Sequence, residues 1–134
     1  MIKIYYTFAL RNDPKLPQMK GFFESFKYAL KGIRSSIYEQ RNLKVQSVVA
    51  IITIGAGFYF RITAIEWYVI LLVIGLVMGL EMVNSAIESL VDLVTRERKP
   101  LAGKVKDVAA GAVLFASIIA VVIGVLIFRK YLIS

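Results

Sequence analysis

Three long apolar runs, each bounded by charged residues, constrain the fold of this 134-residue chain more than any other feature. A helix needs roughly 20 residues to cross the hydrocarbon layer of a membrane. The run at residues 108–128 has about that size, and the run at residues 45–60 is slightly short. The helical pattern at residues 67–94 is longer than a crossing requires, so its last turns are expected to emerge into the cytosol. A mean hydropathy of +0.70, with 58% hydrophobic residues, is too high for a soluble domain. The sequence therefore predicts an all-α membrane protein with three transmembrane helices.

The segment before the first crossing predicts a different kind of helix. Residues 1–20 contain two prolines and are expected to form a variable tail, separate from a domain at residues 21–134. From about residue 21 to residue 40, aromatic and aliphatic side chains recur on one helical face, and a mostly basic face lies opposite. Such an amphipathic helix fits a position in the membrane interface.

The basic residues predict the orientation of the chain. They are abundant before the first crossing and between the second and third, whereas the first external loop offers only Arg61. The positive-inside rule then places the N-terminus in the cytosol. The net charge of +8 is explained by basic residues that lie at lipid headgroups or meet a phosphorylated ligand, and no nucleic-acid partner is expected.

The composition limits the available chemistry. The chain has no cysteine and no histidine, so it has no thiol nucleophile, imidazole base or Cys/His zinc site. Any reaction must use carboxylates, amines and amides. Small residues at helical spacing, in Gly75–Gly79 and in a stripe from Ala112 to Gly124, allow close helix packing. Because three helices enclose a polar site poorly, a homo-oligomer is expected.

An acidic stripe on the second crossing is the strongest candidate for function. Asn84, Glu88 and Asp92 lie at about −60°, −20° and +20° from Glu81 around a helix of 3.6 residues per turn. Carboxylates in or near hydrocarbon are costly and usually serve function. Alternatively, the stripe is a cytosolic surface with a few interhelical hydrogen bonds. That alternative explains Asp92 well and Glu81 poorly, so Glu81 is the candidate proton acceptor.

A basic segment, expected to be a loop at residues 95–107, follows this helix. It contains Gly103–Lys104 but is not a P-loop, because Arg98 stands where a glycine is required. Its charges suit either polyphosphate or anionic headgroups. Lys106 can meet phosphate, and the neighbouring Asp107 can bind a purine or ribose group.

These motifs resemble the prokaryotic diacylglycerol kinase and undecaprenol kinase family. The resemblance covers about residues 21–128 and rests on the segments 81–88, 91–92 and 101–107, with support from 25–29, 31–34, 41–42 and 66–67. It implies a membrane lipid kinase domain that acts as a homotrimer, with active sites between subunits at the cytosolic face of the bacterial inner membrane. It also implies ATP as the phosphate donor, Mg²⁺ as the cofactor and a membrane lipid as the acceptor.

The resemblance assigns roles to individual residues. Glu81 matches the general base, Asn84 shapes its surroundings, and Glu88 matches a magnesium ligand that also contacts the nucleotide. The further residues that match nucleotide contacts are Tyr28, Glu97, Lys106 and Asp107, and those assigned to the lipid are Arg34 and Ser35, together with Glu81.

One position departs from the family pattern. A second metal-ligating glutamate usually precedes Arg41, but this chain has Gln40 there, with Glu39 one residue earlier. Either residue is a candidate ligand, and a weakened magnesium site is expected.

The acceptor lipid and two other functions remain as alternatives. Residues 41–42 and 109–114 look more like the undecaprenol kinase branch, which favours undecaprenol over diacylglycerol. A small oligomeric transporter or channel would instead use Glu81 to line a cation pathway. A noncatalytic membrane scaffold would need neither ATP nor Glu81.

Overall fold

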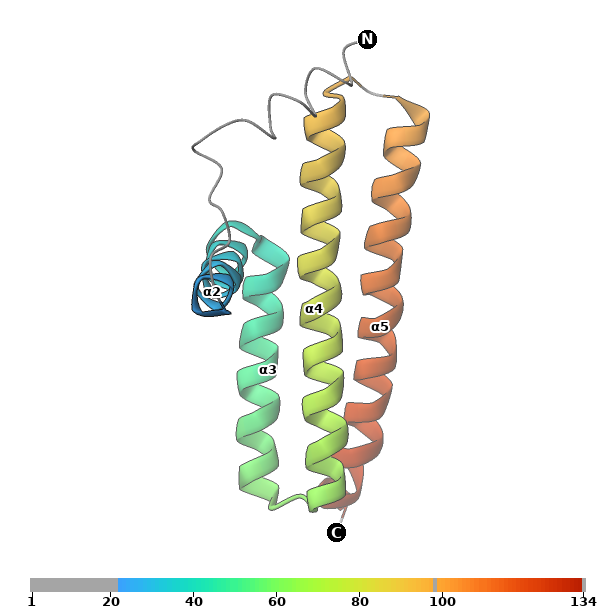
Figure 1. Ribbon diagram of the computed structural model, residues 1–134. Helices are drawn as coiled ribbons and strands as arrows, with labels where there is room; N and C mark the ends of the chain where they lie inside the picture. Colours follow the sequence, from blue (N-terminus) through green and yellow to red (C-terminus); the bar gives the residue numbers. More distant parts are fainter. Residues whose placement is uncertain (1–21, 98, 134) are drawn as a thin grey trace. The chain divides into compact units, whose positions relative to one another are not determined.

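The computed structural model describes residues 22–97 and 99–133, so the tail expected at residues 1–20 lies outside them. The chain divides into two compact units, residues 1–32 and 33–134, and each is described by itself. Three helices are long and apolar enough to span a membrane, which confirms the all-α membrane fold. The elements are α2 (Phe22–Glu39), α3 (Arg41–Phe60), α4 (Ala64–Val94) and α5 (Pro100–Ile133) (Figure 1).

Helix α2 has the amphipathic pattern that the sequence predicts. Its apolar Phe26 and Leu30 and its basic Lys27 and Lys31 are all exposed. The helix ends at Glu39, because Gln40 adopts an extended backbone with φ −91° and ψ 119°. The interfacial helix therefore does not continue into the first crossing, and α3 has 20 residues of its own.

The connection from α3 to α4 is a tight turn. Arg61 adopts a left-handed conformation with φ 52°, and its backbone N–H donates to the carbonyl of Phe58. Thr63 then precedes α4, and both its backbone N–H and its hydroxyl donate to Glu66 Oε2 at 2.8 Å. The ring of Trp67 packs against that of Phe58 at a tilt of 52°, with ring centroids 4.8 Å apart. Capping and ring packing together fix the start of α4 against the end of α3.

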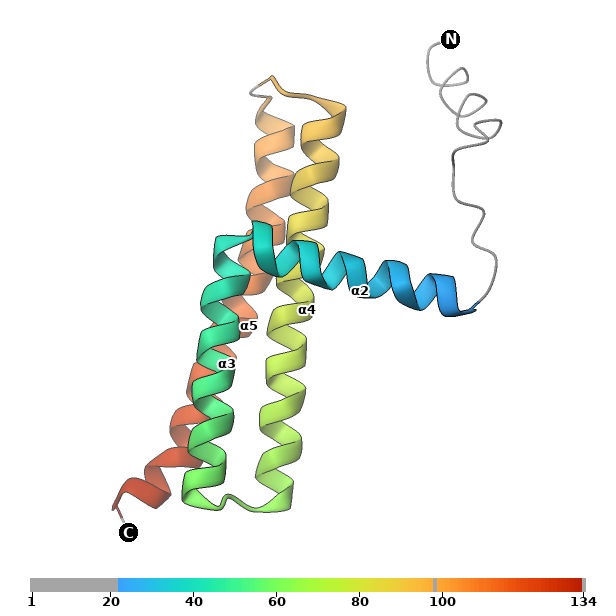
Figure 2. The same cartoon turned by 90° about the vertical axis from the view of Figure 1, so that its left-hand side faces the viewer.

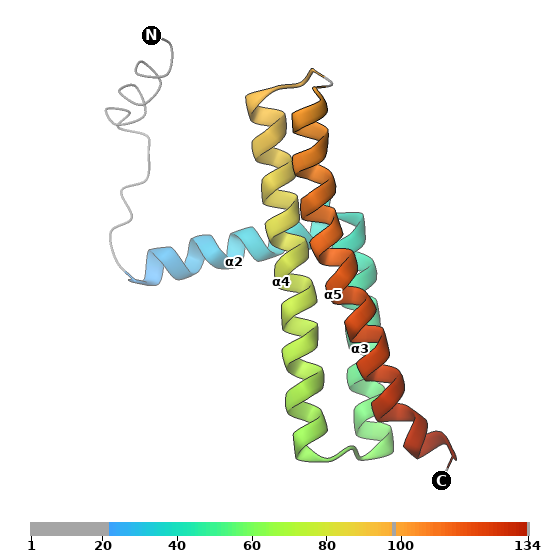
Figure 3. The same cartoon turned by 90° about the vertical axis from the view of Figure 1, so that its right-hand side faces the viewer.

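Helices α4 and α5 lie side by side (Figures 2 and 3). At one end the segment 95–99 joins them. At the other end Lys130 forms an ion pair with Glu66, and the Tyr131 hydroxyl donates to Glu66 Oε2 at 2.8 Å. Both ends of the helix pair are therefore tied.

The prediction of a loop at residues 95–107 was wrong in its second half. Helix α5 starts at Pro100, so Lys104, Lys106 and Asp107 lie on its first turns. Proline is favoured at the first position of a helix because its missing N–H is not needed there. The same helix runs to Ile133, past the crossing predicted to end at residue 128.

The side-chain core of the second unit is small, and its fully or nearly buried apolar residues include Leu43, Ile70, Val77 and Val113. An apolar cavity of about 380 Å³ lies between α3, α4 and α5. Helices α4 and α5 also continue past the start of α3 (Figure 1). Consequently the first half of α4 is flanked by two helices, and its last turns by α5 alone.

Candidate active site

Glu81 is the buried carboxyl at the centre of the acidic stripe. Only 3% of the residue is exposed, because it lies on the face of α4 that packs against the other helices. Its Oε2 accepts a hydrogen bond of 3.4 Å from the Nε2 amide of Gln46, which comes from the second turn of α3. Its Oε1 has no side-chain partner among the described residues. One carboxylate oxygen is thus held while the other remains able to accept a proton.

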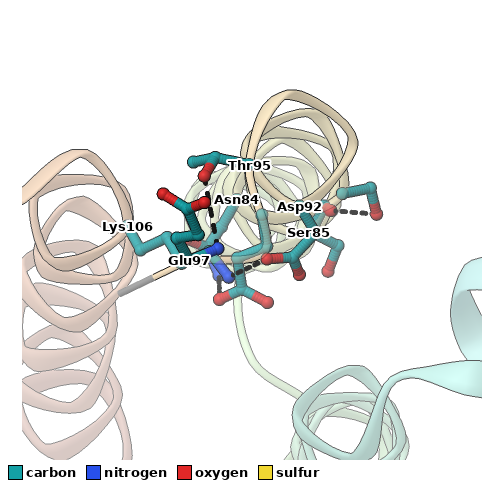
Figure 4. Close-up of polar contacts among 8 residues, drawn as sticks. Asn84, Ser85, Asp92, Thr95, Glu97 and Lys106 are labelled. Atoms are coloured by element: carbon teal, nitrogen blue, oxygen red, sulfur yellow. Dashed lines mark hydrogen bonds and ion pairs between the residues drawn. The ribbon is translucent and has the colours of Figure 1, made fainter. Parts of the chain in front are cut away.

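Asn84 and Ser85 form the next layer of polar groups along α4 (Figure 4). Asn84 is 5% exposed, and its Nδ2 donates to Glu88 Oε1 at 3.0 Å. Its Oδ1 is buried and has no hydrogen-bond partner among the described residues. The Ser85 hydroxyl donates to the backbone carbonyl of Glu81 at 3.0 Å. Within the predicted stripe, the structure therefore joins Asn84 to Glu88 through their side chains.

A polar pocket of about 390 Å³ lies at the end of α4, where the chain turns into α5. Its charged lining residues are Asp92, Arg96, Glu97, Lys99 and Lys106. Lys106 reaches from α5 to Asp92 at 2.6 Å, and Lys99 pairs with Glu97 at 3.2 Å (Figure 4 shows the first pair). Arg96 has no charged partner among the described residues. The pocket therefore offers an anionic ligand one unpaired guanidinium and two amines that can exchange partners.

The structure brings together some of the predicted nucleotide residues. Glu97 and Lys106 line the polar pocket, and Glu88 lies one helical turn before Asp92 on the same helix. Asp107 is exposed on α5 and is not part of the pocket lining. Tyr28 belongs to the other unit, so its position relative to the pocket is not described.

Apart from Glu81 and Glu88 on α4, the residues predicted for lipid and metal lie on and after α2. The Arg34 guanidinium stands over the ring of Tyr38 at 5.7 Å, and Ser35 is half-buried. Glu39 is exposed at the end of the helix, and Gln40 is half-buried in the break that follows. The structure gives no contact between either of them and Glu88.

The described residues do not contain three acidic side chains close enough to hold a metal ion between them. Mg²⁺ is commonly bound by one or two carboxylates and completes its octahedron with water and substrate phosphates. Glu88 fits that mode, because Asn84 orients its Oε1 while its Oε2 accepts nothing from the described residues. The donor set therefore suits a magnesium ion that arrives with a nucleotide.

Two polar residues of the site were missed in the sequence. Gln46 lies in the first apolar run and Ser85 lies in the segment 81–88, but no role was predicted for either residue. The available signal was the position of Gln46, a polar side chain inside one crossing facing a helix that carries an isolated acid. A buried amide in hydrocarbon needs a hydrogen-bond partner, and Glu81 is that partner.

Known proteins resemble this chain over most of its length. The profile of the family described as prokaryotic diacylglycerol kinase matches residues 27–128. The chain is 40% identical over 111 residues to the undecaprenol kinase of Bacillus subtilis, covering 83% of this chain and 90% of that protein. It is 42% identical over 101 residues to the diacylglycerol kinase of Synechocystis, covering 75% of this chain and 58% of that protein. It is 32% identical over 95 residues to the diacylglycerol kinase of Escherichia coli K12, covering 71% of this chain and 78% of that protein.

Proposed function

Since the chain belongs to the prokaryotic diacylglycerol kinase family and is a lipid kinase, we propose that it phosphorylates the primary hydroxyl of undecaprenol. The phosphate donor is ATP, the metal is Mg²⁺, and diacylglycerol is the less favoured acceptor. The observation that carries this proposal is the buried Glu81 on the helix that also leads to the polar pocket.

The spacing of acidic residues along α4 supports separate positions for the nucleotide and the lipid hydroxyl. With a rise of 1.5 Å per residue, Glu88 lies about 10 Å along the helix from Glu81, and Asp92 about 6 Å further. The polar pocket begins at Asp92, and its cations suit the nucleotide. A nucleotide held there extends its phosphates along α4 towards Glu88, and the lipid hydroxyl meets the terminal phosphate beside Glu81.

The transfer itself needs one base and good positioning. Glu81 Oε1 takes the proton of the lipid hydroxyl as that oxygen forms a bond to the γ-phosphorus. The bond between the γ-phosphorus and the β,γ-bridging oxygen breaks, and ADP leaves. Asn84 keeps the Glu88 carboxylate in place throughout. Glu88 would hold the magnesium ion, whose charge would offset that of the phosphate oxygens.

The nucleotide contacts are proposed at the pocket and next to it. Lys106 exchanges Asp92 for a phosphate oxygen, which is a gain because the phosphate carries more charge than one carboxylate. Glu97 accepts from the sugar or base. Asp107, on the same helix as Lys106, completes the proposed nucleotide contacts of this unit, and Tyr28 is a nucleotide contact that the family resemblance implies.

The lipid-facing part of the proposal concerns α2. Arg34 and Ser35 contact the lipid headgroup, and the exposed apolar face of the helix rests in the interface. Undecaprenol is favoured because residues 41–42 and 109–114 look more like the undecaprenol kinase branch, and the Bacillus subtilis undecaprenol kinase is among the relatives of this chain.

We further propose a homotrimer in the bacterial inner membrane, with the N-terminus and the active site on the cytosolic side. Little of each candidate spanning helix is buried within one chain. In the most apolar 18-residue stretch, the buried share is 17% for α3, 28% for α4 and 11% for α5. Side chains added at Gly75 or Gly79 would meet nothing within 4 Å. These open faces of α4 suit contact with other subunits.

The experiment is transfer of labelled γ-phosphate from ATP to purified undecaprenol or diacylglycerol in mixed micelles, with and without Mg²⁺. Labelled undecaprenyl phosphate that forms only with magnesium is the expected product. Faster labelling of diacylglycerol would reverse the acceptor assignment. Absence of any labelled lipid from folded, oligomeric protein would overturn the kinase proposal, and nucleotide-independent ion flux would then favour a channel.

A further inference from the structure

Gln46 is the one described side chain that hydrogen-bonds the Glu81 carboxylate, and it comes from a different helix. Its amide nitrogen lies 3.4 Å from Glu81 Oε2, which is long for a hydrogen bond, and catalytic hydrogen bonds often shorten when substrate binds. The amide carbonyl Oε1 of Gln46 is buried and has no partner among the described residues. No other described protein group fixes this amide, so its orientation is set by Glu81.

The surroundings of Gln46 leave no substitute donor in the described structure. It lines the wall of the cavity of about 380 Å³ whose other lining residues are mostly valine, isoleucine and alanine. The other hydroxyl-bearing residues of that wall, Thr53 and Ser117, make no hydrogen bond to Glu81 in the described structure. Ser47, the next residue along α3, donates to the Leu43 carbonyl of its own helix at 2.8 Å. Glu81 would therefore lose its only side-chain donor if Gln46 were replaced.

A glutamate side chain turns about three single bonds, so a base on such a chain needs an external contact to hold one geometry. The bond from Gln46 holds Oε2, and Oε1 has no side-chain partner among the described residues. Misplacement of a reacting group by about 1 Å can reduce a rate by about 100-fold. A single interhelical hydrogen bond at this point therefore has a large effect on turnover.

We infer that Gln46 is a positioning residue for phosphate transfer, which holds the Glu81 carboxylate across the α3–α4 contact through its amide nitrogen. This inference rests on the proposed role of Glu81 as the base. Gln46 itself touches neither nucleotide nor metal, and its effect falls on the turnover number and not on substrate affinity.

The test compares Gln46→Met, Gln46→His and the control Ser47→Ala, each in the full-length protein. Methionine has nearly the length of glutamine but no donor, whereas histidine restores an N–H group. The control removes a hydrogen bond from the neighbouring residue without touching Glu81. We expect Gln46→Met to lower kcat about 10- to 100-fold with KM for lipid and ATP within about twofold. Gln46→His should recover much of the loss, and Ser47→Ala should match wild type.

A second readout does not depend on activity. The antisymmetric carboxylate stretch of Glu81, identified in the infrared spectrum by its loss in Glu81→Gln, should move in Gln46→Met and stay in place in Ser47→Ala. If Gln46→Met does not assemble, Gln46→Asn serves instead, because it retains the amide but withdraws it by one methylene. An unmoved band with unchanged kcat, or a change in KM alone, would overturn the inference. If the wild-type protein transfers no phosphate, the proposed function fails, while a band shift still shows that Gln46 holds Glu81.

Discussion

The contact between Gly57 and Trp67 gives a stability prediction with a matched control. A Cβ atom added at Gly57 would lie 2.9 and 3.0 Å from two carbons of the Trp67 ring and 3.1 Å from Ile62 Cδ1. Carbon atoms pack best at about 3.5–4.0 Å, so α3 and α4 would have to separate by roughly 0.5–1 Å. Overpacking of this kind costs about 1–3 kcal/mol.

Gly55→Ala on the same helix separates this clash from the effect of adding a methyl group. Both replacements remove a glycine from a helix, a gain of about 1 kcal/mol, but a Cβ at Gly55 meets nothing within 4 Å. Gly57→Ala should therefore be about 1–3 kcal/mol less stable than Gly55→Ala.

The measurement is reversible unfolding in mixed micelles, followed by circular dichroism and by the fluorescence of Trp67, the single tryptophan of the chain. Gly55→Ala should raise the midpoint relative to wild type, and Gly57→Ala should fall below Gly55→Ala. Equal midpoints for the two variants would refute the reasoning, because the close approach of α3 to the Trp67 ring would then have no energetic consequence.

Three further predictions concern the proposed chemistry. Glu81→Gln keeps the size of the side chain and should lower kcat by about 10²–10⁴ while assembly and nucleotide binding persist; near-normal turnover would remove Glu81 as the base. Glu88→Gln should raise the Mg²⁺ concentration needed for half-maximal rate, and an unchanged titration would point to other ligands. Gln40→Glu, which adds the second carboxylate expected from the family pattern, should lower that concentration; a titration identical to wild type would exclude position 40 from the metal site.

The sequence predicted the helices well, because each is recorded in a local pattern. The amphipathic face of α2 and the apolar runs depend on residues a few positions apart. The ends of α5 were not predicted. Its start was hidden by the charges of residues 100–107, and its end is held by Lys130 and Tyr131, whose partner Glu66 is more than 60 residues away in sequence.

The candidate site was predictable along one helix and not between helices. The 3.6-residue period placed Glu81, Asn84 and Glu88 on one face, and the structure has Asn84 bonded to Glu88. The partnership of Gln46 with Glu81 depends on how far α3 is shifted along α4. That shift is set by the turn at residues 61–63 and by the packing of Trp67 on Gly57, which no local pattern records.

The uninterrupted course of α4 from Glu81 to Asp92 fixes the distance between the proposed base and the pocket proposed for the nucleotide. Substitutions between these residues leave the separation unchanged, whereas one inserted residue would shift it by 1.5 Å and rotate one end by about 100° relative to the other. Seven inserted residues would nearly restore the rotation but would increase the distance between Glu81 and Asp92 along the helix by about 10 Å. Variation in this segment is therefore restricted to exchange of side chains, because any change in its length alters either the reach or the facing of the two ends.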